Sequence, residues 1–445
     1  MCHGTVLKWG WDGPRVMDDL VLLENSPNHR GERLGKCQRE LLRKRVAEFM
    51  ALCQKYEVGA LDLPDRARNI TTTLNVLWQE WLAEARTSAA AAQVSTASLM
   101  AITYPPEKVQ PALLPKRAND STAFGASCSL AGTRALFMRN CDGPDIVHHA
   151  VSRATAPGSL AHVALCEAAD IGVKAFVNEA GLAGTYYIGP QVNDYTLTAI
   201  QPSLVLRHLC ERASSCAGAL SEFDALHKRQ NPGTPDKRGV CYLFADASGE
   251  VLLLEATASR YHFSRGKNSL VITTNKFLLG DSPQPRLEPF RERSLRVFLT
   301  AAPLDCARAL AAARLDQRSG AEKGVCDVDT RASFIAALGE GGKTSYALVT
   351  LGSPLCNPAV PLFPRLGAPA GMVDGWFYEE AFRSVEPTGA RKAMRIEYEK
   401  TLLSRLAAIG PSSSDEDLAT ITNDLCALAR KFLETPATPG QVAAV

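Results

Sequence analysis

Two adjacent segments organise this chain, and they read Phe124-Gly125-Ala126-Ser127-Cys128-Ser129-Leu130 and Thr133-Arg134-Ala135-Leu136-Phe137-Met138-Arg139-Asn140-Cys141-Asp142. A run of small residues ends in a cysteine, an apolar strand follows, and that strand closes on a charged cluster. A turn near Ala131-Gly132 would make the two segments an antiparallel hairpin. We expect the hairpin to return Arg139 and Asp142 toward Cys128. The pattern therefore predicts a cysteine nucleophile beside a guanidinium and a carboxylate.

These residues resemble a family. Cys128-Ser129-Leu130, a strand and then Arg139-Asn140-x-Asp142 resemble the N-terminal nucleophile hydrolases of the penicillin acyltransferase (peptidase C45) group, which are related to the choloylglycine hydrolases. A second block, Asn178-Glu179-x-Gly181-Leu182, resembles a conserved segment of the same family. The resemblance runs thinly over about residues 28 to 355. It implies an α+β fold, the four-layer αββα sandwich.

The resemblance also implies maturation by self-cleavage between Ser127 and Cys128. Residues 1–127 would then form a helical prosegment and residues 128–445 the catalytic chain, with a helical C-terminal extension from about residue 376. The cut makes chemical sense because a free thiol is only a few per cent thiolate near neutral pH and needs a neighbouring base. The new α-amino group has an ordinary pKa of about 7.7 to 8.0 and could serve as that base.

Other site residues follow from the same resemblance. Asp142 would hold the α-amino group, Arg139 would orient the thiol, and Asn275, at the end of the predicted strand 269–275, would donate to the oxyanion. The expected supporting or substrate-binding residues are Asn140, Asn178, Tyr186, Tyr187 and Arg293. Each has an ordinary structural alternative: a surface ion pair for Arg139 and Asp142, a turn residue for Asn275, a hairpin cap for Asn178 and a solvated helix face for Arg293.

A competing nucleophile stands at the start of the chain. Met1-Cys2 followed by Arg15-Val16-Met17-Asp18 imitates the arrangement of choloylglycine hydrolases. Cys2 is the poorer candidate because valine follows Arg15 where asparagine is expected, and because two glycines and a proline interrupt the intervening strand. With Cys2 as the nucleophile, no internal cut would occur.

Composition excludes several classes of function. The 49 lysines and arginines nearly balance the 47 acidic residues, which gives no electrostatic reason to bind nucleic acid or an anionic membrane. No apolar run reaches the roughly 18 to 20 residues of a membrane span, so we expect a cytoplasmic protein. The 13 cysteines lack paired spacing, which indicates reduced thiols and no disulfide framework or zinc site. We expect no metal and no cofactor, although acyl-CoA is a possible substrate.

Periodicity divides the chain into two parts. Helical spacing of apolar residues predicts helices from Arg30 to about Ile102, whereas strands dominate after Cys128. Hairpins are predicted at 161–178 and 240–255, and single strands at 269–275 and 345–354. Helices are predicted from Pro202 to about Leu220, from Arg291 and over 391–409.

Three functions remain open. An acyl-cysteine resolved by an amine would make the chain an N-acyltransferase for a small molecule or peptide-like metabolite, and one resolved by water would make it an amidohydrolase. A noncatalytic scaffold with the same fold is the alternative from another class. For the enzyme, the expected partners are a small-molecule acyl donor, an amine acceptor and the chain's own prosegment. Ile188, in place of an expected asparagine, argues against bile-salt-type substrates.

Overall fold

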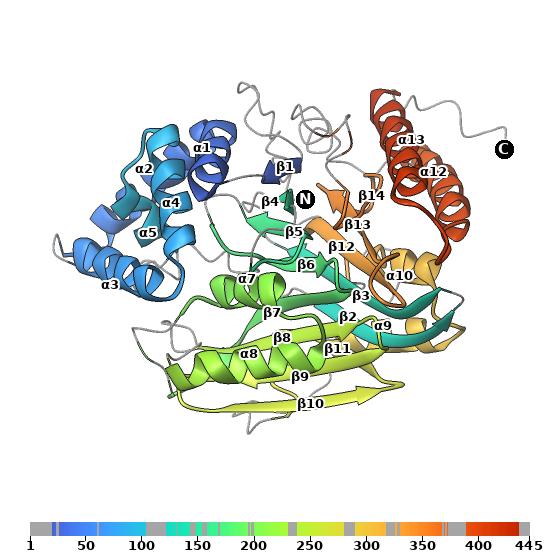
Figure 1. Cartoon of the computed structure of the whole chain (residues 1–445), viewed down its shortest axis with the longest axis horizontal. Helices are drawn as coiled ribbons and strands as arrows, with labels where there is room; N and C mark the ends of the chain where they lie inside the picture. The colour runs from blue at the N-terminus through green and yellow to red at the C-terminus, as the bar shows by residue number, and fades with distance from the viewer. Residues whose placement is uncertain are drawn as a thin grey trace, which may run out of the picture.

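The computed structural model describes residues 20–23, 26–59, 62–103, 122–130, 132–142, 148–153, 158–167, 170–194, 196, 200–229, 238–279, 290–316, 325–326, 330–366, 369, 372 and 389–435. The first part is a short strand and a group of helices, as predicted for residues 30–102. These elements are β1 (Leu20–Leu23), α1 (Pro27–Cys37), α2 (Arg39–Lys55), α3 (Asp62–Leu77), α4 (Gln79–Ala92) and α5 (Thr96–Thr103). The helices α1 to α5 lie together on one side of the molecule, whereas β1 lies beside β4 (Figure 1).

Local sequence explains how these helices begin and pack. Ser26 caps α1 by accepting the N–H of the third residue on, and Pro27 occupies the first helical position, where no N–H is needed. Gly31 and Gly35 of α1 face α4 so closely that a β-carbon at either would lie 2.0–2.2 Å from an α4 atom. The two glycines therefore permit the close crossing of α1 and α4.

Two sheets follow. The eight-stranded sheet has the order β1-β4-β5-β6-β7-β8-β9-β10, and the six-stranded sheet has the order β11-β2-β3-β12-β13-β14. The bounds in the first sheet are β4 (His148–Arg153), β5 (His162–Glu167), β6 (Ala175–Asn178), β7 (Leu182–Gln191), β8 (Arg238–Asp246), β9 (Glu250–Ala256) and β10 (Tyr261–Lys267). Those in the second are β2 (Thr122–Leu130), β3 (Thr133–Asp142), β11 (Leu270–Thr273), β12 (Thr330–Gly339), β13 (Tyr346–Leu351) and β14 (Val360–Leu362). Neighbouring strands are antiparallel, except that β1 pairs with β4 in parallel.

The two sheets pack face to face, with helices on both outer faces. The helices α7 (Pro202–Arg212) and α8 (Cys216–Arg229) cover the eight-stranded sheet. The helices α9 (Phe290–Thr300), α10 (Cys306–Ala313), α12 (Gly389–Ala407) and α13 (Asp415–Glu434) adjoin the six-stranded sheet. This arrangement confirms the predicted α+β fold, a four-layer αββα sandwich.

Side chains of β3 alternate between the two faces of its sheet. Arg139 donates to Thr185 of β7 and so points into the space between the sheets. Asn140 donates to the main chain at Ala313 and Val325 and so points toward the helical layer. Because the side-chain period of a strand is two, Cys141 shares the face of Arg139, and Asp142 shares the face of Asn140.

Most predicted elements are confirmed. The hairpins β5–β6 and β8–β9, the strands β11 and β13, and the helices α9 and α12 lie where periodicity placed them. The single helix predicted from Pro202 to Leu220 is wrong, because Ala213 takes an extended conformation and ends α7 before α8 begins at Cys216.

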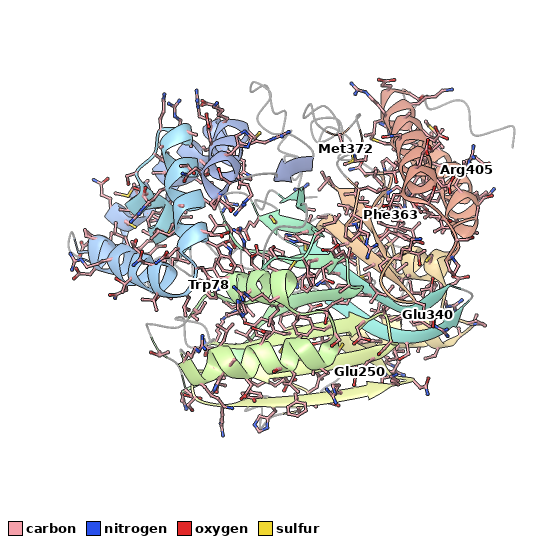
Figure 2. The ribbon with its side chains drawn as sticks, viewed as in Figure 1. Trp78, Glu250, Glu340, Phe363, Met372 and Arg405 are labelled. Atoms are coloured by element: carbon pink, nitrogen blue, oxygen red, sulfur yellow. The ribbon has the colours of Figure 1, made fainter. Side chains whose placement is uncertain are left out.

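A buried polar network joins the N-terminal helices to α7. Glu84 of α4 accepts two hydrogen bonds from Arg207 of α7, at 3.0 and 2.8 Å, and one from Arg30 of α1 at 3.2 Å. Two tryptophans of the same region also donate across this contact, Trp78 to His208 and Trp81 to Glu211. Figure 2 labels Trp78 where the N-terminal helices approach α7. We call this set the α4–α7 network.

Within the described ranges, every helix is either too short or too polar to cross a lipid bilayer.

Candidate functional site

Cys128 lies near the turn of the β2–β3 hairpin. Its thiol is half-buried and contacts the carbonyl oxygen of Thr133 at 3.5 Å, across the irregular pairing that precedes the turn. Its neighbour Ser127 is held firmly, because the Ser127 main-chain N–H donates to Ser269 O and its hydroxyl donates to Gly249 O. The predicted cut between residues 127 and 128 therefore falls inside a hydrogen-bonded strand.

The hairpin does not bring Arg139 and Asp142 back to Cys128, so that expectation is wrong. In an antiparallel hairpin, partners lie equally far from the turn, and the partner of Arg139 is Ala123. Cys128 is five residues farther along β2, or about 17 Å at 3.4 Å per residue. Cys128 and the charged cluster thus occupy opposite ends of the hairpin.

The arginine at the Cys128 end of the hairpin is Arg134, the residue after Thr133. Its guanidinium forms a 2.7 Å ion pair with Glu340, which holds the pKa of Arg134 above its usual value, and Cys128 contributes less to that shift. Glu340 is labelled in Figure 2 and lies just beyond the end of β12. Both charged side chains are largely exposed. The pair is an exposed ion pair, of the kind that contributes little stability.

The predicted residues Arg139, Asp142 and Asn275 gather at the other end of the hairpin, where β2 begins. We call this region the β2-start site. Thr273 of β11 pairs with Ala123, so Asn275 follows directly beyond the same end of β2. The structure brings three of the four predicted catalytic residues to one end of the six-stranded sheet and leaves Cys128 apart.

Arg139 is buried between the sheets and bound mainly by β7. Its guanidinium donates to the Thr185 hydroxyl at 3.0 Å and to the main-chain oxygen of Tyr186, and it stacks 4.3 Å from the ring centre of Tyr187. Burial disfavours its charge, but the neighbouring Cys141 and Tyr187 hold the pKa of Arg139 above its usual value. Arg139 therefore supplies a fixed positive charge inside the sandwich.

Asp142 lies on the helical face of the same strand end. It accepts the Thr330 hydroxyl at 2.6 Å and the Arg291 guanidinium at 2.9 Å. Sequence reasoning selected Arg293 in this helix, but Arg293 is exposed, whereas Arg291, two residues earlier in α9, reaches the carboxylate. Two residues correspond to about 200° of helix rotation, so only one of the pair can face the sheet.

Asn275 uses one amide N–H to reach the facing sheet. Its Nδ2 donates to the Ile188 carbonyl at 2.8 Å, and its Oδ1 is buried with no hydrogen-bond partner among the described residues. A side-chain amide carries two N–H groups, so the second remains available to a ligand. Arg139 and Asn275 thus both bind the 185–188 segment of β7.

Three other predicted residues have structural contacts that occupy them. Asn178 is fully buried; its amide donates to Cys210 O and Ala213 O, and its oxygen accepts the Leu182 N–H. It closes the β6–β7 turn and binds the end of α7, which matches its alternative as a turn cap. Tyr186 and Tyr187 are both buried, on opposite faces of β7. Tyr186 accepts from Lys174 at 2.6 Å, so the two tyrosines do not line one common surface.

Sequence reasoning missed the residues that begin β2. Ala123 faces Arg139 and offers no nucleophile, but Thr122, the partner of Asn140, carries a hydroxyl that is buried with no hydrogen-bond partner among the described residues. The Cys141 thiol also lies at this end, beside Arg139, and burial raises its pKa. The sequence did contain a signal for Thr122 and Ala123. Partners in a two-stranded hairpin lie equally far from its turn, so the turn at Ala131-Gly132 places these two residues opposite Asn140 and Arg139. Cys2, the competing nucleophile, lies outside the described residues.

Comparisons with known proteins give weak likenesses. No family model matches the chain, and no curated protein matches it. Among solved structures, the N-acylethanolamine-hydrolyzing acid amidase ortholog of Caenorhabditis elegans aligns at 12% identity and a TM-score of 0.35, over 48% of this chain and 92% of that one. Penicillin V acylase from Agrobacterium tumefaciens aligns at 13% identity and a TM-score of 0.36, over 54% and 86%. A mutant of conjugated bile acid hydrolase from Clostridium perfringens aligns at 12% identity and a TM-score of 0.35, over 56% and 95%. At these TM-scores, the likeness assigns neither a family nor an activity.

Proposed function

We propose that this chain is an enzyme that breaks an amide bond through an acyl-enzyme intermediate and passes the acyl group to an amine or to water. One observation carries the proposal: Arg139, Asp142 and Asn275 all lie toward the end of the six-stranded sheet where β2 begins, with Asp142 on its helical face and the other two on the face toward the second sheet. The three were selected from the sequence for acyl transfer, and they are distant from one another in the sequence. Their convergence supports a common role.

The chemistry of acyl transfer needs donors for the oxyanion that forms when a carbonyl is attacked. The second N–H of Asn275 is suited to that role, and one such donor typically contributes about 2.7 to 4 kcal/mol to transition-state stabilisation. Arg139 adds positive charge in an environment that excludes water, where electrostatic interactions are stronger than in solvent. Asp142 would hold the α-amino group that acts as the base.

The nucleophile has two candidates on β2. Cys128 remains the prediction from the sequence. The register adds Thr122, which shares the helical face of Asp142, whereas Arg139 and Asn275 reach into the space between the sheets. Thr122 lies at the same end of the strand as Asp142, which is two residues beyond its partner Asn140. A cut that makes Thr122 the first residue of a chain would give its hydroxyl an α-amino base, just as proposed for Cys128.

After either cut, we propose that the two pieces stay together as a heterodimer. The α4–α7 network supports this, because Glu84 and Arg207 lie on different sides of both candidate cuts and bind each other at 2.8 Å. Both side chains are at most 5% exposed, so separating the pieces would leave buried charges without partners. The substrates proposed are a small-molecule acyl donor, either an amide or a thioester such as acyl-CoA, and an amine acceptor.

Intact mass spectrometry tests the proposal and locates the nucleophile. Wild type and the variants Cys128→Ala and Thr122→Val would be compared when freshly expressed. Pieces of 127 and 318 residues, absent only from Cys128→Ala, would assign Cys128. Pieces of 121 and 324 residues, absent only from Thr122→Val, would assign Thr122. A panel of acyl-CoA thioesters and amides with an amine acceptor then separates transfer from hydrolysis.

A noncatalytic binding protein is the second candidate. Ala123 is the residue opposite Arg139, and an alanine there favours a fold that has kept its charges without a nucleophile. An uncut chain that also leaves every compound of the panel intact would establish this reading and reject the enzyme.

A further inference from the structure

A row of polar side chains crosses four strands of the six-stranded sheet. Thr122 of β2 pairs with Asn140 of β3, Asn140 pairs with Ser333 of β12, and Ser333 pairs with Thr350 of β13. Directly paired residues point to the same face of a sheet. These four side chains therefore form one line, which we call the polar row.

The polar row is buried beneath the helical layer. Asn140 donates to the main-chain oxygens of Ala313 and Val325, at 2.8 and 3.1 Å, which fixes the face on which the row lies. The four residues are 0 to 1% exposed. The row is thus enclosed between the sheet and the chain around the end of α10.

Each member of the polar row has a buried oxygen without a partner. Among the described residues, no hydrogen bond reaches Thr122 Oγ1, Asn140 Oδ1, Ser333 Oγ or Thr350 Oγ1. A buried polar atom left unbonded costs stability, and the large majority of such atoms in proteins have a protein or water partner. Four unbonded oxygens in one line therefore point to a ligand.

The row next to the polar row, on the same face of the sheet, consists of apolar side chains. Two residues along each strand, on the same face, Phe124 pairs with Met138, Met138 with Ile335, and Ile335 with Leu348. All four of these residues are buried and apolar. The polar row therefore lies directly beside a fully apolar row on the same face.

The spacing of the strands suits water as the ligand. Neighbouring strands lie about 4.7 to 4.9 Å apart, and paired β-carbons about 4.5 to 5.5 Å apart, so paired side-chain oxygens can bond either directly or through a shared water. Among the described residues, no direct hydrogen bond joins two oxygens of the row. A water between two oxygens spans about 5.5 Å, from two hydrogen bonds of about 2.7 to 2.8 Å. Hydroxyl and amide oxygens all accept from water, and two to four polar partners are what a buried water requires.

We propose that the polar row binds a file of ordered water molecules, one between each neighbouring pair of oxygens from Thr122 to Thr350. The file satisfies all four oxygens and lets a polar line cross the apolar sheet–helix interface. Thr122 is also a candidate nucleophile, but the water file is tested at Thr350 of β13, which has no part in the proposed chemistry.

A crystal structure at a resolution that shows ordered water tests the proposal. Density within about 2.6 to 3.2 Å of two neighbouring row oxygens is the expected result. Side chains rotated to bond one another directly, or space without density between them, would overturn the proposal. The same structure of Thr350→Val should lack the water nearest residue 350.

Thermal unfolding of the variants gives an answer that does not need crystals. Thr350→Val removes a hydroxyl at almost constant volume. If the row is hydrated, the variant strips a bonding partner from a buried water, and the melting temperature falls. If the row is dry, the variant removes an unbonded polar group, and the melting temperature rises. A rise, or no change, contradicts the water file.

Thr422→Val is the matched control. Thr422 of α13 is 3% exposed and donates its hydroxyl directly to Leu418 O at 2.7 Å. The fall in the melting temperature of Thr422→Val measures the effect of removing one ordinary hydrogen bond of a buried threonine. Thr350→Val should shift the melting temperature in the same direction.

Discussion

The α4–α7 network makes Glu84 the most sensitive charged residue in the contact between the N-terminal helices and α7. Glu84 is 1% exposed and neutralises two buried guanidinium groups, those of Arg30 and Arg207. Glu84→Gln keeps the shape of the side chain and removes its charge. Breaking a buried ion pair by removing one partner typically costs about 3 to 5 kcal/mol, because the remaining charge stays buried.

The structure places the expected cost near the lower end of that range. Arg207 keeps a second carboxylate, that of Glu211, at 2.9 Å, and Arg30 keeps a contact with Glu80 at 3.6 Å. Neither guanidinium is therefore stripped of every negative neighbour. We expect Glu84→Gln to lower the free energy of unfolding by about 3 kcal/mol.

Urea unfolding followed by tryptophan emission is the suitable assay. Trp78 and Trp81 stack with ring centres 4.4 Å apart beside the network, so their emission reports the release of the N-terminal helices. Circular dichroism recorded in parallel reports loss of secondary structure in the whole chain. Two transitions that separate in Glu84→Gln would show that the helices leave before the sandwich unfolds.

Glu80→Gln is the matched control, because Glu80 also contacts Arg30 but is 66% exposed. We expect this variant to stay within about 0.5 kcal/mol of wild type. Equal decreases in the free energy of unfolding for the two variants would refute the claim that burial determines how much the network stabilises the protein. A decrease of less than about 1 kcal/mol in Glu84→Gln would refute it as well.

Three further predictions concern the backbone, a buried histidine and a helix cap. Gly181 has φ +82°, and a β-carbon there would lie 2.7 Å from the nearest side chain. Gly181→Ala should therefore lower the free energy of unfolding, measured in urea, by about 2 to 4 kcal/mol. Its control is Gly341→Ala, where φ is +66° and the space is open, so only the backbone strain of about 1 to 2 kcal/mol is expected. Burial lowers the pKa of His208 although Glu222 partly opposes the shift, and its Nδ1 accepts an indole N–H, so the fold favours the neutral ring. The stability that the neutral His208 ring contributes is complete above the unfolded pKa of about 6.5 and is lost as the pH falls through the folded pKa. Between pH 7.5 and pH 5, the melting temperature of wild type should therefore fall further than that of His208→Gln. Parallel curves of melting temperature against pH for the two proteins would contradict this. Ser414 forms a capping box at the start of α13, and Ser414→Ala should lower the free energy of unfolding by about 1 kcal/mol, measured by urea unfolding with the exposed Ser412→Ala as control.

Much of the architecture was predictable because it depends on local patterns. Alternation and turn glycines located the hairpins β5–β6 and β8–β9, and helical spacing located the N-terminal helices. Three of the four catalytic candidates, Arg139, Asp142 and Asn275, each follow or end a recognisable strand, and they lie toward one end of the six-stranded sheet. The pairing of β2 with β3 was predicted from the sequence, whereas the pairing of β11 with β2, which places Asn275, was not.

The position of Cys128 was mispredicted for a reason of register. The turn was placed correctly, but Cys128 lies three residues before Ala131 and Arg139 lies seven after Gly132, so an antiparallel hairpin cannot bring them together. The polar row could not be predicted at all. Its members come from segments up to 228 positions apart, and each looks alone like an ordinary strand hydroxyl or amide.

The parallel pairing of β1 with β4 has a consequence for self-association. β4 would otherwise be the outermost strand of the eight-stranded sheet, with unpaired main-chain groups able to recruit a strand from another molecule. The opposite border of that sheet is β10, where exposed Arg265 and Lys267 discourage such contacts by their charge. The four-residue β1 therefore replaces the six-residue β4 as the outermost strand, and very short edge strands are a common protection against strand addition. A protein shortened to begin at Ser26 would expose the longer strand, β4, to aggregation.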